Sequence, residues 1–255
     1  ALGETADVYF DDARSGGIVA MPAMTVALEW PPSRDIRIMP GFGATDMERL
    51  RGVHAAQDTH FHQPIRPGDK LSNRGRVISV EQIRPGVRVI FRFDITDAAG
   101  KAVVTSYSTV IYRGVETRGG DLIGEVAPAW LCGDAPSTWG EVTIPIARGL
   151  PHVYSECANI WNPIHTEREV ALAAGLPDII LHGTCTWALA LKAVIEAYAD
   201  GDPVRLARFS GRFTGMVIPG SVITVRHGMV AGGACVEVIT ADGTAAISEG
   251  RAVFR

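Results

Sequence analysis

The stretch TCTWALALKAVIEAYAD (residues 184–200) constrains the architecture of this chain more than any other. It is apolar on nearly every side of a helical projection until Lys192 and Glu196, which are spaced four residues apart. A helix that is apolar all round has to be buried, and a curved antiparallel sheet is the cover that we expect for it. We therefore predict an α+β architecture in which such a sheet wraps a central helix.

Strands that could cover this helix follow it directly. GMVIPGSVITVRHGMV (215–230) begins with a Pro-Gly turn and continues as an alternating β-branched strand, and ACVEVITADGTAAISEGRAVFR (234–255) resembles a hairpin closed at a Gly. The same order of features occurs earlier, in PIRPGDKLSNRGRVISV (64–80) and VRVIFRFDITDAAGKAVVTSYSTVIYR (87–113). The chain therefore contains two copies of one unit.

The first copy has its own helical candidate, IVAMPAMTVALEW (18–30), which Pro22 breaks early. Between the copies, residues 114–140 are rich in Gly, Pro and small residues and show no sustained periodicity, which indicates a linker. We therefore expect an N-terminal unit over residues 1–115, a linker over 116–139 and a C-terminal unit over 140–255.

The composition excludes several classes of protein. The chain has 255 residues, of which 47% are hydrophobic, and a formal net charge of -4, which suits one or two compact domains. No run approaches the ~18 uninterrupted apolar residues that cross a bilayer, and no leader-like segment opens the chain, so we expect a cytoplasmic protein with no membrane partner. Basic residues are scattered singly, which argues against a nucleic-acid partner.

The cysteines give no sign of a metal or disulfide site. They lie in four different segments and form no CxxC pair, so we expect reduced thiols. These residues are Cys132, Cys157, Cys185 and Cys235.

The segment YSECANIWNPIH (154–165) carries the first candidate for chemistry. Asn162 and the Pro after it fix an extended or turn geometry just before His165. Thr166 and Glu169 then fit a capping box for a short helix from about residue 167 to 174. His165 is therefore expected at a helix N-terminus, either as a catalytic base or as a histidine that closes the turn.

The second candidate is the start of the long apolar helix, in IILHGTCTWALA (179–190). Unpaired backbone N–H groups at a helix N-terminus carry the positive end of the helix dipole and can stabilise an oxyanion. Gly183 lets a ligand approach this backbone, although a tight turn alone would also call for Gly. His182 is expected to shape the turn.

Taken with RFTGMVIPGS (212–221), these two motifs make the second copy similar to the MaoC-like, or hydratase 2 type, (R)-specific enoyl-CoA hydratases of the hotdog fold. The first copy, with THFHQPIRPGDKL (59–71), resembles the N-terminal half of the double-hotdog members, in which only the C-terminal half keeps the catalytic motif. The resemblance implies a double hotdog, two copies of a buried helix wrapped by a curved antiparallel sheet. It also implies hydration or dehydration of acyl thioesters of CoA or a carrier protein, with no metal and no redox cofactor.

Residue by residue, the resemblance assigns catalysis to His165 and Asn162 and the oxyanion contact to the amide of Gly183. The family also uses an Asp five residues before the His, and that position here holds Ile160. A positioned acid or base typically contributes roughly 100- to 10,000-fold in rate. Ile cannot transfer a proton, so half of the family's acid and base machinery is missing from its usual place.

Three explanations stay open at this point. Glu156 or Asn159, which precede Ile160, could replace the carboxylate. His165 could act alone in a different reaction of the same thioesters, such as double-bond isomerisation or ring closure by a hydroxyl of the substrate. The chain could also bind acyl thioesters without turning them over. We rank the MaoC-type lyase first, because Asn162, His165 and Gly183 are all present in their expected surroundings.

A CoA or carrier-protein arm would need cations for its phosphates. Arg205, Arg208 and Arg212 lie near the strand that follows the apolar helix, at a spacing that puts two of them on one face. We predict phosphate contacts there. Hotdog units are stable when two of them pair their sheets, and this chain supplies both, so it is expected either to suffice alone or to form a homodimer.

Overall fold

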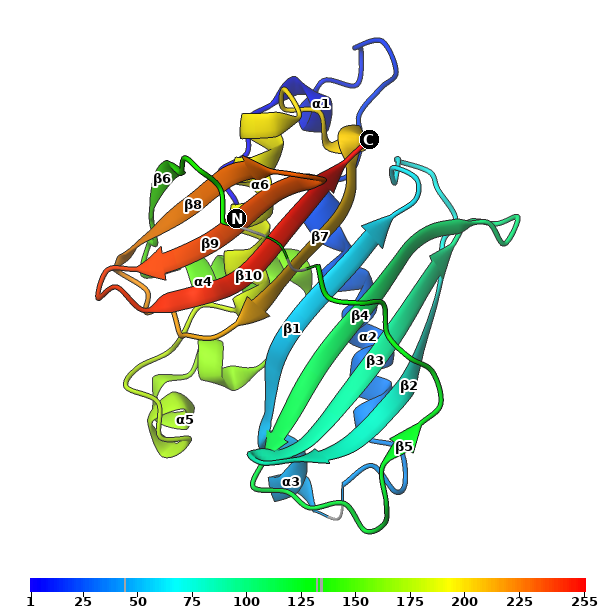
Figure 1. Cartoon of the computed structure of the whole chain (residues 1–255), viewed down its shortest axis with the longest axis vertical. Coiled ribbons are helices and arrows are strands. Elements are labelled where there is room, and N and C mark those ends of the chain that lie inside the picture. Colours follow the sequence, from blue (N-terminus) through cyan, green and yellow to red (C-terminus); the bar gives the residue numbers. More distant parts are fainter. Residues whose placement is uncertain (44, 132, 134) are drawn as a thin grey trace.

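The computed structural model of the chain describes residues 1–43, 45–131, 133 and 135–255, in which ten strands form one continuous sheet (Figure 1). The strand order is β5-β2-β3-β4-β1-β7-β10-β9-β8-β6, so each half of the chain supplies one half of the sheet. The first half contributes β1 (Gly52–Phe61), β2 (Ser72–Ile83), β3 (Gly86–Thr96), β4 (Ala102–Arg113) and β5 (Leu122–Ile123). The second contributes β6 (Gly140–Pro145), β7 (Leu206–Phe213), β8 (Val222–Val230), β9 (Gly233–Thr240) and β10 (Ala245–Phe254).

Strands β1 and β7 join the two units by antiparallel pairing, with Asp58 opposite Ser210. Arg208 of β7 reaches across this seam and binds both carboxylate oxygens of Asp58, at 2.8 Å from Nε and 2.6 Å from Nη2. The Asp58 side chain is only 5% exposed. A bidentate, largely desolvated ion pair therefore links the two halves in addition to the backbone ladder.

The long apolar helix of the second unit is α6 (Gly183–Tyr198), and it packs against β7, β8, β9 and β10. Its residues from Cys185 to Leu191 are all buried, and Trp187, with no exposed surface, packs against Phe209 of β7. The prediction of a buried helix covered by an antiparallel sheet is confirmed here.

The helix of the first unit corrects the prediction. A short 3-10 turn, η1 (Pro22–Met24), precedes α2 (Thr25–Arg37), which therefore begins later than residue 18 and continues well past residue 30 through Pro31 and Pro32. Pro32 lacks the N–H that would bind the carbonyl of Leu28 one turn earlier. The side-chain amide of Asn73 in β2 donates to that carbonyl instead, at 2.6 Å. A distant strand thus satisfies the acceptor that the proline leaves free.

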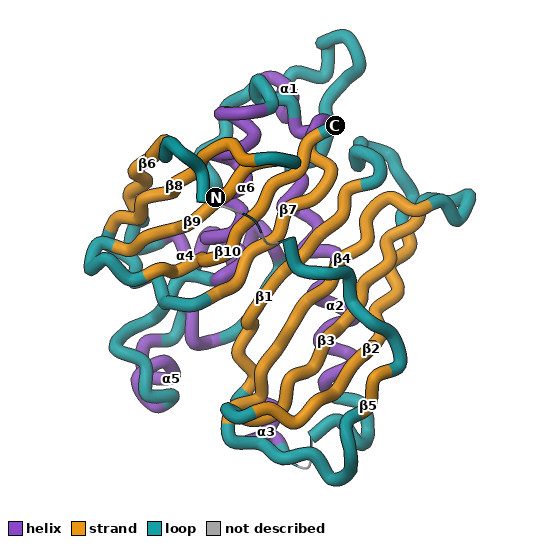
Figure 2. The backbone as a smooth tube through the Cα atoms, viewed as in Figure 1, coloured by secondary structure: helices purple, strands orange, loops and turns teal. Residues whose placement is uncertain are grey.

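The remaining helices are short, and Figure 2 shows the helices gathered on one face of the sheet. None of the described helices is both long and apolar enough to cross a bilayer. The short elements are α1 (Asp7–Phe10), α3 (Asp46–Leu50), α4 (Leu150–Ala158), η2 (Pro163–His165), α5 (Arg168–Ala173) and η3 (Pro203–Arg205).

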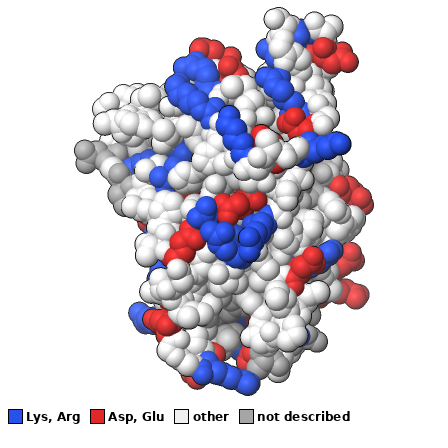
Figure 3. All heavy atoms as spheres, turned by 90° about the vertical axis from the view of Figure 1, so that its right-hand side faces the viewer, with Lys and Arg blue, Asp and Glu red and all other residues white. Residues whose placement is uncertain are grey.

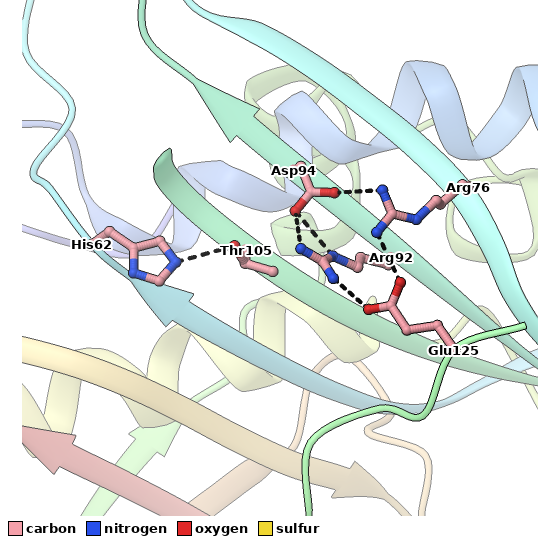
Figure 4. A network of polar contacts seen from close by, with 6 residues as sticks. All are labelled: His62, Arg76, Arg92, Asp94, Thr105 and Glu125. Atoms are coloured by element: carbon pink, nitrogen blue, oxygen red, sulfur yellow. Dashed lines mark hydrogen bonds and ion pairs between the residues drawn. The ribbon is translucent and has the colours of Figure 1, made fainter. Parts of the chain in front are cut away.

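The connection between the units runs over the opposite face of the sheet (Figure 1). Glu125, just after β5, is bound by Arg76 of β2 at 2.8 Å and by Arg92 of β3, and Asp94 binds the same two arginines (Figure 4). This network holds the start of the connection on the first unit. On the face shown in Figure 3, basic and acidic side chains are intermingled, so no field of one sign covers it.

Candidate active site

A cavity of about 480 Å³ lies between the two units. The first unit contributes one face of α2 and parts of β1, β3 and β4. The second contributes the segment around η2, the start of α6 and the residues that follow β7. Both sequence motifs line this one cavity, and their residues there include Ile160, Asn162, His165, His182 and Gly183.

His165 is held in one tautomer. It ends the turn η2, whose N-cap residue Asn162 accepts a hydrogen bond from the backbone N–H of Ile164 at 3.4 Å. The Nδ1 atom of His165 lies 2.8 Å from the carbonyl oxygen of Ile180, which can only accept, so Nδ1 carries the proton. Burial lowers the pKa of His165 to about 4. At neutral pH the ring is therefore uncharged, and its Nε2 is a free proton acceptor.

His182 packs directly on this ring, with centroids 3.7 Å apart and planes inclined by 24°. Its Nε2 lies 3.4 Å from the carbonyl oxygen of Ile160 and 3.2 Å from the hydroxyl of Ser155. Burial first, and then the neighbouring His165, lowers the pKa of His182 to about 3. An uncharged His182 thus ties the loop of Ile160 to the start of α6 and supports the face of His165.

The first turn of α6 presents backbone amides to the cavity. The N–H groups of Cys185 and Thr186 both donate to the carbonyl of His182, at 3.0 and 3.1 Å, whereas Gly183 and Thr184 precede these bonds and line the cavity. A Cβ on Gly183 would lie 3.1 Å from the ring of Phe213, which is another wall residue. Gly183 therefore leaves space beside the backbone amides of the first turn of α6. The helix dipole makes these amides a favourable site for an oxyanion.

Position 160 contributes an apolar wall. Ile160 is 7% exposed and lines the cavity together with the two histidines. Its carbonyl oxygen lies 3.4 Å from Nε2 of His182. The two substitutes that the sequence suggested lie elsewhere. Asn159 caps the end of α4 in a left-handed conformation and accepts a hydrogen bond from the indole of exposed Trp161, and Glu156 is exposed on α4. Neither residue is among those that line the cavity.

The predicted capping box is wrong. Helix α5 starts at Arg168 with Glu167 as its N-cap residue, and no side-chain capping bond forms. Thr166 is instead the C-cap residue of the turn η2, where its N–H donates to the carbonyl of Pro163. Because the preceding turn uses Thr166, this residue cannot also begin the next helix.

The three predicted phosphate-binding arginines already have carboxylate partners. Arg205 binds Asp200 at 2.5 Å, Arg208 binds Asp58, and Arg212 binds Glu249 at 2.7 Å. Arg208 and Arg212 do share one face of β7, as predicted from their spacing, but none of the three lines the cavity. The arginines that do line it are Arg37 and Arg113.

A buried polar cluster of the first unit escaped the sequence analysis. Glu29 of α2 is 5% exposed and accepts a hydrogen bond from the side-chain amide of Gln57 at 3.0 Å. Gln57 also contacts Thr59 at 3.1 Å. Nearby, His54 lies 3.0 Å from the hydroxyl of Ser108, and burial lowers its pKa to about 4. The one signal in the sequence was a lone acid within the apolar run around residue 29.

Cys157 and Cys185 are free thiols, the first exposed and the second buried, and Cys235 is buried in β9. Cys132 lies outside the described residues. Cys157 and Cys185 agree with the expectation of reduced thiols.

Known proteins match both halves of the chain. Residues 145–248 match the model of the MaoC like domain, and residues 1–106 match that of the FAS1-like dehydratase domain region. An enoyl-CoA hydratase of Mycobacterium tuberculosis is 29% identical over 206 residues, which cover 80% of this chain and 68% of the relative.

Solved structures agree in fold. A MaoC-like dehydratase from Phytophthora capsici superposes with a TM-score of 0.82 at 20% identity, covering 100% of this chain and 89% of that one. A Mycobacterium tuberculosis protein described as a double hotdog superposes with a TM-score of 0.61 at 15% identity, covering 99% and 84% of the two chains. The fold is therefore a double hotdog. The chain therefore carries a MaoC-like domain behind a FAS1-like dehydratase region, and the relatives that it matches include enoyl-CoA hydratases.

Proposed function

We propose that the cavity binds an acyl thioester and interconverts its 2-enoyl and 3-hydroxyacyl forms, with His165 as the base and the amide of Gly183 as the oxyanion donor. One observation carries this proposal. An uncharged imidazole with a free Nε2 and the amides at the start of α6 line the same 480 Å³ cavity. That volume is typical of pockets for small ligands.

The chemistry follows from these two groups. The Nε2 of His165 accepts a proton from water while the water oxygen bonds to C3 of the enoyl thioester. The electron pair of the C2=C3 bond moves toward the thioester carbonyl, whose oxygen gains negative charge. The amide of Gly183 and the dipole of α6 stabilise that charge where it develops. The enolate then takes up one proton at C2 and His165 releases one, so the net change is the addition of one water. Asn162 caps the turn that presents His165 and so acts as a positioning residue. No metal or redox cofactor is needed for these steps.

The anionic arm of the thioester is best placed near Arg37 and Arg113. Both line the cavity, and Arg113 is exposed, so the cavity meets solvent on its side. The three arginines predicted from the sequence already form ion pairs with carboxylates, so they are poorer candidates for binding phosphate: Arg205, Arg208 and Arg212. The arm belongs to CoA or to an acyl carrier protein.

A second reaction is favoured by one specific observation. Ile160 puts an apolar side chain where the family has a carboxylate. A water molecule beside His165 therefore has no carboxylate at this position to bind it by a hydrogen bond. A reaction that needs no added water suits such a wall. Double-bond isomerisation and attack of the substrate's own hydroxyl on the enoyl group, which closes a ring, are both of this kind.

Incubation with a panel of thioesters tests these alternatives together. The panel contains 2-enoyl and 3-hydroxyacyl thioesters of CoA and of N-acetylcysteamine, with and without a distal hydroxyl, and mass spectrometry follows the products. A mass gain of one water supports hydration. An unchanged mass with a new chromatographic position supports isomerisation or cyclisation, and a stable complex without turnover would identify a binding protein.

A further inference from the structure

We propose that Glu29, a residue of the first unit, is the second proton-transfer group of this site and takes over the task of the carboxylate that position 160 lacks. This inference rests on the proposed hydratase function, because it assigns a further catalytic residue to the same cavity.

The carboxyl group of Glu29 has one oxygen fixed and one left unsatisfied. Oε2 accepts the hydrogen bond from Gln57 at 3.0 Å. Oε1 is buried and has no hydrogen-bond partner among the residues that the structure describes. A purely structural buried carboxylate normally has both oxygens satisfied, because leaving one bare is costly. A carboxyl group that binds a substrate atom is expected to have such an unpaired oxygen, and Glu29 lines the cavity.

The fold directs Glu29 toward this cavity. Four other residues of α2 line it, at the three- and four-residue steps of a single helix face, and they are Val26, Trp30, Ser33 and Arg37. His165 and Gly183 of the second unit line the same cavity.

The polar network behind Glu29 holds it in place. Gln57 donates from one amide nitrogen to Glu29 and to Thr59, and the hydroxyls of Thr59 and Ser106 lie 2.8 Å apart. Thr59 and Ser106 have no exposed surface, and Gln57 has almost none. A side chain supported by buried, hydrogen-bonded neighbours keeps the geometry that proton transfer requires.

The protonation states of the two groups are complementary. Burial raises the pKa of Glu29 to about 7, whereas burial lowers that of His165 to about 4. Between these values a carboxylic acid and an uncharged imidazole coexist in one cavity. Environments that separate the pKa values of two titratable groups assign one as the acid and the other as the base.

The step balances with these two groups. His165 takes one proton from water, and the water oxygen forms the bond to C3 as the C2=C3 π bond breaks. Glu29 gives its carboxylic proton to C2, where the enolate electron pair forms the new C–H bond. The imidazolium and carboxylate that result exchange one proton through solvent and return to their starting states. The net change is the addition of one water to the enoyl thioester, and dehydration is the reverse.

The test compares Glu29→Gln with the native protein. Gln keeps the size and the acceptor for Gln57 but cannot transfer a proton, so kcat/KM for enoyl-thioester hydration should fall by roughly 100- to 10,000-fold. Glu156→Gln is the matched control, because it removes an exposed carboxyl outside the cavity, and its rate should stay native. A saturated acyl-CoA should bind Glu29→Gln as it binds the native protein, which would show that the cavity is intact.

Two further readouts separate proton transfer from a structural role. The native pH profile of kcat/KM should rise above pH 4 and fall above pH 7, and Glu29→Gln should lose the upper limb. Glu29→Asp, which keeps an acid, should retain that limb at a reduced rate. Adding Ile160→Asp to Glu29→Gln should restore hydration, because it returns a carboxyl to the other wall of the cavity.

The outcomes distinguish the two proposals. A native protein that turns over no thioester of the panel refutes the proposed function. A native protein that hydrates enoyl thioesters, with Glu29→Gln at the native rate, refutes the role of Glu29 alone. If Glu29→Gln does not fold, a Glu29→Asp variant with an unchanged rate and no limb near pH 7 contradicts it equally.

Discussion

The imidazole rings of His165 and His182 stack with centroids 3.7 Å apart, and both are uncharged at neutral pH. Each ring also has a nitrogen beside a backbone carbonyl, that of Ile180 for His165 and that of Ile160 for His182. The pair therefore joins the loop before η2, the segment before α6 and the first turn of α6 into one wall. That wall holds the ring of His165 in place at the cavity.

The buried histidine predicts how stability depends on pH. The pKa of His165 is about 4 in the folded protein and about 6.5 in the unfolded chain, so between these values the unfolded chain binds more protons. The free energy of unfolding should therefore fall as the pH drops from 6.5 toward 4, by on the order of 3 kcal/mol for this residue. Urea titrations across this range should give a shallower slope for His165→Asn, and an equal slope would contradict the burial of the ring.

Glu29 predicts a dependence of the opposite sign. Its pKa is raised to about 7 in the folded protein, so between about 4.5 and 7 the folded protein binds more protons than the unfolded chain. Stability should therefore fall as the pH rises through this window, by about 3 kcal/mol at most. Glu29→Gln should be more stable than the native protein at pH 8 and should lose this dependence. A variant less stable at pH 8 would show that the carboxylate is paired.

Gly183 gives a prediction about space. Gly183→Ala keeps the backbone N–H but adds a methyl group 3.1 Å from the ring of Phe213, inside the cavity. We expect kcat/KM to fall by up to about 100-fold because the thioester oxygen can no longer approach the amide. Stability should change by no more than about 1 kcal/mol, since the better helix propensity of Ala offsets the crowding. Gly149→Ala, whose added Cβ meets no atom within 4 Å, should keep the native rate.

The seam between the units gives a prediction about stability alone. Arg208→Met removes the partner of Asp58 and leaves a carboxylate that is 5% exposed without its main cation, which should lower the free energy of unfolding by about 3 kcal/mol. Arg205→Met breaks a pair in which Asp200 is 94% exposed and should cost under about 1 kcal/mol. Chemical denaturation measures both. Adding Asp58→Asn to Arg208→Met should recover most of the loss, and no recovery would mean that Arg208 acts through packing.

The sequence predicted those features of the structure that depend on one local pattern of residues. The unbroken apolar character of residues 184–200 predicted a buried helix, and α6 is that helix. The two motifs around His165 and Gly183 were placed in one site, and they line one cavity.

The predictions that failed involve partners far away in the chain or a competing local structure. Helix α2 continues through two prolines because Asn73, on another strand, binds the carbonyl of Leu28. The predicted phosphate contact of Arg208 could not anticipate Asp58, which lies 150 residues earlier. Glu29 was overlooked because nothing beside it in the sequence shows that α2 lines the same cavity as His165.

Initial rates of 2-enoyl-thioester hydration, measured side by side for the native protein and His165→Ala, test the proposed function most directly. We expect the native protein to add water and His165→Ala, folded by circular dichroism, to be slower by roughly 100- to 10,000-fold. Hydration by His165→Ala at the native rate would contradict the assignment of this imidazole as the base.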